Sequence, residues 1–208
     1  MPPKHFVANC LPRDISSKQG LPMRLHLLDA SRHGKLLAMY LAYQPRNCFQ
    51  GLPPIRDEVC TNWVEGMIRD GVSIVAVPAE SDTVVGHVAI FPINPRKCEL
   101  LVVVAPALQN QGIGTELVRS AAELADERGF RQVWLPVDAT NGRARRVYEK
   151  CGFDYTSSGL ARELDMALDL AQKKRFSPSC AAPQPPRPHL LSASLGLTNS
   201  AGPVSAGF

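Results

Sequence analysis

The sequence has no apolar stretch long enough to cross a bilayer and no cysteine pattern typical of a metal site. Its longest apolar run, residues 100–108, has nine residues, whereas a membrane-spanning helix needs about 20. The six cysteines form no C-x-x-C pair and no group with histidine at metal-ligand spacing. We therefore expect no metal and no membrane partner, and reduced thiols in a cytoplasmic protein.

Most of the chain also carries no net charge. Residues 1–170 carry 19 basic and 19 acidic side chains, and the formal charge of +4 comes from residues 171–208. A neutral body gives no reason to expect nucleic acid or an anionic membrane as a partner. The first residues, with prolines at positions 2, 3 and 12, do not have the apolar core of a secretory signal.

Several well-known catalytic and phosphate-binding motifs are absent as well. No serine lies in a G-x-S-x-G elbow. The turn at residues 109–114 has Leu117 where a dinucleotide fingerprint needs its third glycine. It also lacks the Gly-Lys-Ser/Thr of a P-loop, because Thr115 and Glu116 follow Gly114. These absences exclude three common classes of site.

What is present is an apolar strand at 99–104, a glycine-bearing turn at 109–114, and an amphipathic helix at 112–128. A helix that begins at such a turn leaves several unpaired N–H groups pointing one way, with the positive end of the helix dipole behind them. The sequence therefore predicts an anion cradle, and phosphate is the anion that such cradles most often bind.

Two motifs in this region resemble those of the GNAT superfamily of N-acetyltransferases. Gln109, Gly112 and Gly114 fit its Q-x-x-G-x-G pyrophosphate loop, and residues 141–153 fit its N-x-x-A-x-x-x-Y-x-x-x-G-F segment. The resemblance implies acetyl-CoA as cosubstrate and transfer of its acetyl group to a primary amine by direct attack. A non-catalytic acyl-CoA-binding or sensing module and a transferase for a larger acyl group are the alternatives.

The periodicity along the chain predicts an α/β (α+β) fold with a mixed, mostly antiparallel sheet of six to seven strands and helices on both faces. The resemblance implies splayed central strands, opened by a bulge. We expect an irregular segment at 1–22, the GNAT-like domain at 23–172, and a Pro/Ser/Ala-rich, disordered tail at 173–208. The second helix, at 55–69, is expected to carry Val59, Trp63, Met67 and either Val64 or Ile68 along one apolar side.

The resemblance assigns three groups of residues to acetyl-CoA. The turn would hold the diphosphate, the backbone edge of the preceding strand would pair with the pantetheine amides, and the start and middle of the next helix would lie beside the pantetheine. The residues are Gln109, Asn110, Gln111, Gly112, Ile113, Gly114 and Thr115 in the turn, Val102, Val103 and Val104 in the strand, and Asn141 and Tyr148 in the helix. For Asn141, the alternative is a simple helix N-cap.

Catalysis needs an acid for the departing thiolate and a base for the ammonium. The resemblance assigns the acid to Tyr148, which could instead be a core tyrosine. Glu99 is the candidate base, although its spacing from Pro106 is one residue short and places it on the opposite face of the strand. His87 is a second candidate for the base, and Asp138 could orient the acceptor.

The acceptor itself is not specified by the sequence. The resemblance implies that the first two helices and their connecting loop shape the acceptor site, which would involve residues 49–54. The acidic pair Asp57 and Glu58 would suit a cationic amine there, although acidic residues at the start of a helix are also what the helix dipole favours. The acceptor is either a small-molecule amine or a protein or peptide amine, and the chain is either a monomer or a homodimer.

Overall fold

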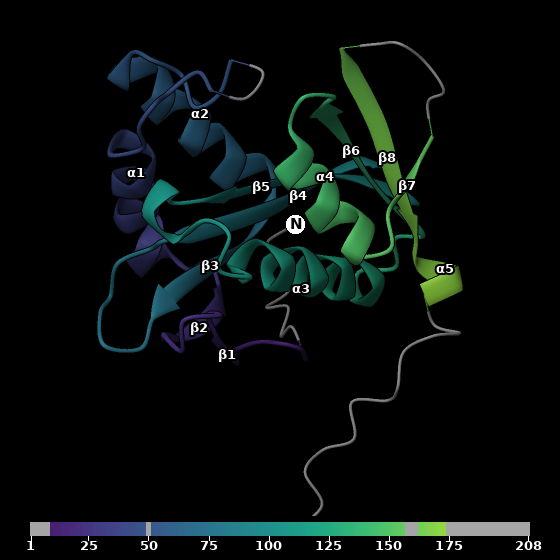
Figure 1. Cartoon of the computed structure of the whole chain (residues 1–208), viewed down its shortest axis with the longest axis horizontal. Helices are drawn as coiled ribbons and strands as arrows, with labels where there is room; N and C mark the ends of the chain where they lie inside the picture. Colours follow the sequence, from purple (N-terminus) through teal and green to yellow (C-terminus); the bar gives the residue numbers. More distant parts are fainter. Residues whose placement is uncertain (1–8, 49–50, 157–161, 174–208) are drawn as a thin grey trace, which may run out of the picture. The chain divides into compact units, whose positions relative to one another are not determined.

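One sheet of eight strands, in the order β1-β2-β3-β4-β5-β6-β8-β7, organises the chain (Figure 1). The computed structural model describes residues 9–48, 51–156 and 162–173. The strands are β1 (Arg13–Ser16), β2 (Pro22–Leu27), β3 (Val72–Pro78), β4 (Gly86–Asn94), β5 (Lys97–Val104), β6 (Gln132–Asp138), β7 (Asp154–Tyr155) and β8 (Glu163–Asp169). The helices are α1 (His33–Leu41), α2 (Asp57–Asp70), α3 (Ile113–Glu127), α4 (Gly142–Lys150) and α5 (Leu170–Lys173), with 3-10 turns η1 (Ala30–Arg32) and η2 (Pro106–Leu108).

The sheet opens between β5 and β6, its one parallel pair of strands among the described residues. Their pairing covers only three residue pairs, from Lys97–Gln132 to Glu99–Trp134, and the strands then separate. β5 stays paired with β4 up to Val104, and β6 stays paired with β8 along its whole length. Two half-sheets therefore diverge as units, which confirms the splayed architecture.

The expected cause of this opening was wrong. The pairing of β5 with β4 is continuous from Cys98 to Val104, so β5 contains no bulge there. The register shift in this pair lies in β4 between Pro92 and Asn94, at the hairpin end. The part of β6 that is no longer paired with β5 contains Pro136, whose ring nitrogen cannot donate a hydrogen bond. The opening thus results from divergence of two well-paired halves.

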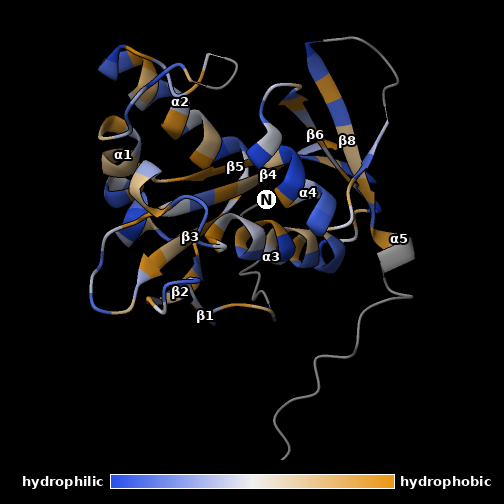
Figure 2. Ribbon diagram, in the orientation of Figure 1, coloured by the Kyte–Doolittle hydropathy of each residue, from blue (hydrophilic) through white to orange (hydrophobic). Residues whose placement is uncertain are grey.

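Helices cover both faces of the sheet and create two cores. In β3, Ile74 and Ala76 belong to the core beneath α3 and α4, whereas Val75 and Val77 belong to the core beneath α1 and α2. Hydrophobic and hydrophilic residues alternate along α3, as in an amphipathic helix (Figure 2). The expected apolar stripe of this helix is confirmed as buried: Ile113, Leu117, Ala121, Leu124 and Ala125.

Two expectations about local structure were wrong. Residues 13–16 of the supposedly irregular segment form β1, which pairs with β2 from Arg13–Leu25 to Ser16–Pro22 and raises the strand count to eight. A strand of four residues gives too short an alternation to be recognised in a sequence. In α2, Val59 is 37% exposed and Cys60 is buried in its place, whereas Met67 and Val64 are buried as expected and Trp63 is partly buried.

Part of the expected domain plan lies outside the described residues. This applies to residues 1–8 and to the tail beyond Lys173, so the boundaries at 23–172 and the disordered tail stay predictions. None of the described helices combines the length and the apolar composition that crossing a membrane would require.

Gly86 of β4 lets the first turn of α3 lie close to the sheet. A β-carbon at Gly86 would lie 2.9 Å from Leu117 Cδ1 and 3.4 Å from Ile113 Cγ2. We expect Gly86→Ala to lower the free energy of unfolding by about 1–3 kcal/mol, because an overpacked core must shift. Urea denaturation measures this change. Gly34→Ala is the control, because no atom lies within 4 Å of the added carbon; equal losses in both variants would contradict the prediction.

Candidate active site

The turn before α3 is an uncapped helix N-terminus. Asn110 and Gly112 have positive φ angles of 62° and 89°, and no side chain caps the helix at Gly112. Within the described part of the chain, the backbone N–H groups of residues 110–114 donate to no acceptor. Consecutive unpaired donors at the positive end of a helix form an anion-binding concavity.

Gln109 and Thr115, at the two ends of the predicted turn, do not share this arrangement. The Thr115 N–H donates to the Gly112 carbonyl oxygen at 3.0 Å, and the Gln109 N–H donates to the Pro106 carbonyl oxygen at 3.3 Å. The run of unpaired N–H groups, called the cradle below, therefore covers residues 110–114 of the predicted turn at 109–115.

The Gln109 side chain braces the turn. Its Nε2 donates to the Val104 carbonyl oxygen at 3.1 Å and to Tyr43 Oη at 3.0 Å, and its Oε1 accepts from Arg143 Nη1 at 3.3 Å. One carboxamide thus connects the end of β5, the residues after α1, and α4. Sequence reasoning missed Tyr43 and Arg143, because contacts between residues so far apart leave no local pattern.

The edge of β5 that faces β6 is unpaired beyond Glu99. The Val103 side chain is buried in the core beneath α1 and α2, and those of Val102 and Val104 pack against the core beneath α3. Anchored side chains and an open backbone edge are what an extended ligand with amide groups needs in order to add as a strand.

Asn141 directly precedes α4 and Tyr148 lies within it; in the view of Figure 1 this helix lies between the labels of β4 and β5 and those of β6 and β8. Asn141 is the N-cap, and its Oδ1 accepts from the Ala144 N–H at 3.1 Å. The Tyr148 ring is 93% buried and packs 5.7 Å from the Phe153 ring. Burial raises the pKa of Tyr148 well above its usual value, so the phenol keeps its proton at neutral pH.

Glu99 lies at the last rung of the β5–β6 pairing, opposite Trp134. Its side chain is half-buried, and burial raises the pKa of its carboxyl group. Strand alternation places it on the same face as Leu101 and Val103, toward α1 and α2. Tyr148 packs on the other face, beneath α3 and α4. The opening between β5 and β6 begins beside Glu99.

The other two candidate residues, His87 and Asp138, make contacts within the fold. His87 is fully buried, its Nδ1 is 2.7 Å from Tyr40 Oη, and burial lowers its pKa from 6.5 to about 3. It is therefore uncharged at neutral pH and has no exposed surface. Asp138 accepts from the Thr140 N–H at 2.8 Å and from Thr140 Oγ1 at 2.6 Å, and these bonds lower its pKa. They hold the turn that precedes α4.

The loop between α1 and α2 is organised by Arg46, whose side chain is 10% exposed. Arg46 Nη1 donates to the Ile55 carbonyl oxygen at 2.8 Å and to Asp57 Oδ1 at 2.6 Å, and Nη2 donates to the Leu41 carbonyl oxygen. Asp57, one of the acidic pair expected to suit a cationic amine, therefore forms an ion pair with a cation of this chain, and its own side chain is 76% exposed.

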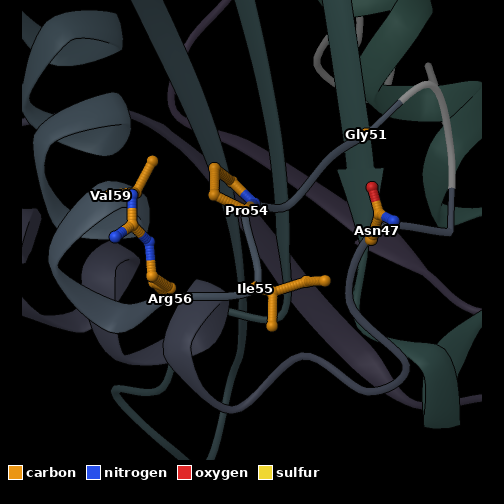
Figure 3. A pocket seen from close by; sticks show the side chains of 6 residues that line it. All are labelled: Asn47, Gly51, Pro54, Ile55, Arg56 and Val59. Atoms are coloured by element: carbon orange, nitrogen blue, oxygen red, sulfur yellow. The ribbon is translucent and has the colours of Figure 1, made fainter.

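Beside this loop is a hollow of about 410 Å³ (Figure 3). It is lined by Asn47, Gly51, Pro54, Ile55, Arg56 and Val59. Ile55 is 67% exposed and extends from the loop toward Asn47, whereas Arg56 and Val59 project from the beginning of α2. The lining is mainly apolar and its charged member is basic. Of the expected loop residues, Phe49 and Gln50 lie outside the described residues.

No three His, Cys, Asp or Glu side chains within the described residues are placed to hold a metal ion. The candidate site residues thus offer backbone donors, an open strand edge, a buried phenol and a half-buried carboxyl group, the last two on opposite faces of the sheet.

The model of the acetyltransferase (GNAT) family matches residues 36–153, more than half of the chain. This span includes the turn, α3 and α4. The chain belongs to the acetyltransferase (GNAT) family. Members of this GNAT family are acetyl-CoA-dependent acyltransferases, which agrees with an anion cradle next to an open strand edge.

Other proteins are similar to this GNAT chain in sequence or fold. Streptothricin acetyltransferase of Streptomyces lavendulae is 37% identical over 93 residues, which are 44% of this chain and 49% of that protein. The chain thus spans about half the length of this curated relative.

Solved structures share the fold at low identity. The GNAT domain of S. lividans PAT has a TM-score of 0.68 at 17% identity, covering 79% of this chain and 99% of that one. The yncA protein of Salmonella typhimurium, solved with its cofactor acetyl-CoA, has a TM-score of 0.57 at 18% identity and covers 71% of this chain and 94% of its own. Spermidine N-acetyltransferase of Vibrio cholerae, solved with CoA and spermine, has a TM-score of 0.58 at 18% identity and covers 72% of this chain and 96% of its own.

Burial of neutral His87 predicts a loss of stability in mild acid. Its folded pKa, about 3, lies below the unfolded value of 6.5, so below pH 6.5 the unfolded chain binds a proton that the folded one does not. From pH 7 to pH 5 this should lower the free energy of unfolding by about 2 kcal/mol. Urea denaturation at both pH values measures the loss.

His87→Gln should remove this part of the pH dependence. Tyr40→Phe should keep it, because burial and not the hydrogen bond lowers the pKa of His87. Identical pH dependence in the wild type and His87→Gln would show that the histidine is accessible to solvent.

Proposed function

We propose that this chain moves the acetyl group of acetyl-CoA to a primary amine by direct attack. The observation that carries the proposal is the run of unpaired backbone N–H groups at residues 110–114, at the uncapped N-terminus of α3. Residues 110–114 would bind the diphosphate of CoA. The edge formed by Val102, Val103 and Val104 would pair with the pantetheine amides and direct the thioester into the opening between β5 and β6.

The reaction needs one proton acceptor and one proton donor. An alkylammonium acceptor has a pKa of about 10 and must lose a proton before it attacks. Glu99 would accept this proton, directly or through water, and its raised pKa makes it a stronger base than an exposed glutamate. The amine nitrogen then bonds to the acetyl carbon, the C–S bond breaks, and the Tyr148 phenol would protonate the departing thiolate.

The acceptor would approach from the side of α1 and α2, the face that Glu99 shares. Two of the similar proteins are named for small-molecule amines, streptothricin and spermidine, and we infer a small-molecule primary amine here. The hollow beside the α1–α2 loop favours an acceptor with an apolar portion over a polyamine, because Arg56 lines it and Arg46 neutralises Asp57. Acetyl-CoA consumption with a panel of such amines tests this. Binding of acetyl-CoA without consumption would support a sensing module.

The two glycines that flank α3 offer a matched test of the cradle. Gly112 and Gly129 have φ angles of +89° and +87°, with no atom closer than 3.8 Å to an added β-carbon at either one. Alanine should destabilise the fold similarly at both, by about 1–2 kcal/mol. Only Gly112→Ala should weaken acetyl-CoA binding, by at least about tenfold, because its turn carries the N–H donors. Calorimetry that finds equal affinities in both variants would refute the diphosphate assignment.

Tyr148→Phe separates catalysis from packing. The ring and its contact with Phe153 stay, so the melting temperature and acetyl-CoA affinity should change little. Turnover should fall by about 10² to 10⁴, the usual contribution of a general acid. The loss should appear in kcat and kcat/KM alike.

Tyr155→Phe is the control for the loss of a phenol. Tyr155 is 41% exposed, and its hydroxyl donates to Glu149 Oε1 at 2.7 Å. This variant should keep its turnover. A fully active Tyr148→Phe enzyme would exclude the general-acid role.

A further inference from the structure

The turn between β1 and β2 lies directly against the cradle. Ser17 is 5% exposed, and its Oγ accepts from the N–H groups of Gln19 and Leu21, both at 3.2 Å. The N–H of Lys18 donates to the Gln111 carbonyl oxygen at 2.9 Å. This backbone hydrogen bond fixes the position of the Lys18 main chain relative to the cradle, whatever the arrangement of its long side chain.

The Lys18 side chain runs across Gly112. A β-carbon on Gly112 would lie 3.8 Å from Lys18 Cγ and 4.0 Å from Lys18 Cε. Nζ is one bond beyond Cε, so the ammonium group lies near Gly112, within reach of a ligand that binds to the turn. In the described part of the chain, this ammonium has no hydrogen-bond or ion-pair partner.

This arrangement places two positive features together. The N-terminus of α3 carries about half a positive charge, and a cation beside it is unfavourable. The acidic residue in the first turn of α3, Glu116, is already paired with Arg119, whose Nη1 donates to Glu116 Oε1 at 2.8 Å. A bound anion between the ammonium and the helix end would turn this repulsion into two attractions.

We propose that Lys18 binds the diphosphate of acetyl-CoA, together with the backbone N–H groups of residues 110–114. The inference rests on the proposed function, which places that diphosphate in the cradle. Lys18 lies outside the span matched by the family model, residues 36–153, and outside both sequence motifs. Its ammonium would donate charge-assisted hydrogen bonds to phosphate oxygens.

The test uses the full chain and calorimetric titration with two ligands, acetyl-CoA and 3′-dephospho-CoA. Lys18→Gln keeps most of the stem and removes the charge, so it should weaken binding of both ligands by about five- to tenfold, as expected for one partly solvent-screened charge. Lys18→Arg should restore most of the affinity. The control is Lys35→Gln, which removes the same charge from α1, where Lys35 pairs with Asp82.

A second readout separates ligand binding from a structural role. Without ligand, Lys18→Gln should melt at the same temperature as the wild type or slightly higher, because the repulsion from the helix end is gone. A lower melting temperature with unchanged affinity would mean that Lys18 only supports the turn. A loss seen with acetyl-CoA but not with 3′-dephospho-CoA would move the contact to the ribose phosphate and overturn the assignment to the diphosphate.

The same titrations distinguish failure of this inference from failure of the proposed function. Wild-type protein that binds neither ligand would overturn the proposed function. Wild-type protein that binds both, with a Lys18→Gln variant of equal affinity, would overturn only the role of Lys18.

Discussion

The short pairing of β5 with β6 is the constraint on which the rest of the site depends. Three residue pairs hold the strands together, and beyond Glu99 and Trp134 each strand is paired only with its own half-sheet. The divergence leaves a row of backbone donors and acceptors on β5 without a strand partner. In an ordinary sheet, such unpaired groups occur only at the edge strands. In the proposed reaction, the base Glu99 would act from the face of α1 and α2 and the acid Tyr148 from the face of α3 and α4, on either side of the place where β5 and β6 separate.

The two helices beside this opening begin in contrasting ways. Asn141 caps α4 with its own side chain, and its Oδ1 accepts from the Ala144 N–H. α3 begins at Gly112 without any side-chain cap, although a capping residue there would stabilise the helix by about 1 kcal/mol. The chain thus leaves the donors of α3 free for a partner that is not part of it. A ligand that binds these donors in the folded state alone also stabilises the fold, which partly offsets the missing cap.

Local patterns in the sequence were sufficient to predict α3 and its turn, because the 3.6-residue periodicity and the spacing of two glycines depend only on residues close together in the chain. Local patterns were insufficient in α2, where Val59 and Cys60 are neighbours in the sequence and are both apolar. Only packing against the sheet decides that Cys60 is buried and Val59 is exposed. The splaying of the strands came from the family resemblance, and its actual origin in two separately paired halves required the observed register. The contacts of Gln109 with Tyr43 and Arg143 join distant segments, so no sequence pattern could indicate them.

The segment before α1 shows why the matched family span is not the whole structural unit. Arg13 forms an ion pair with Glu123 near the end of α3, while the turn after β1 contacts the beginning of the same helix through Lys18 and Gln111. β2 adds Met23 and Leu25, both almost fully buried, to the core beneath α3. The helix that presents the cradle is therefore held by the sheet on one side and by the N-terminal segment at both of its ends. Because a shift of α3 along its axis would move every N–H group of the cradle relative to the β5 edge, these contacts belong to the construction of the site as much as the motif does.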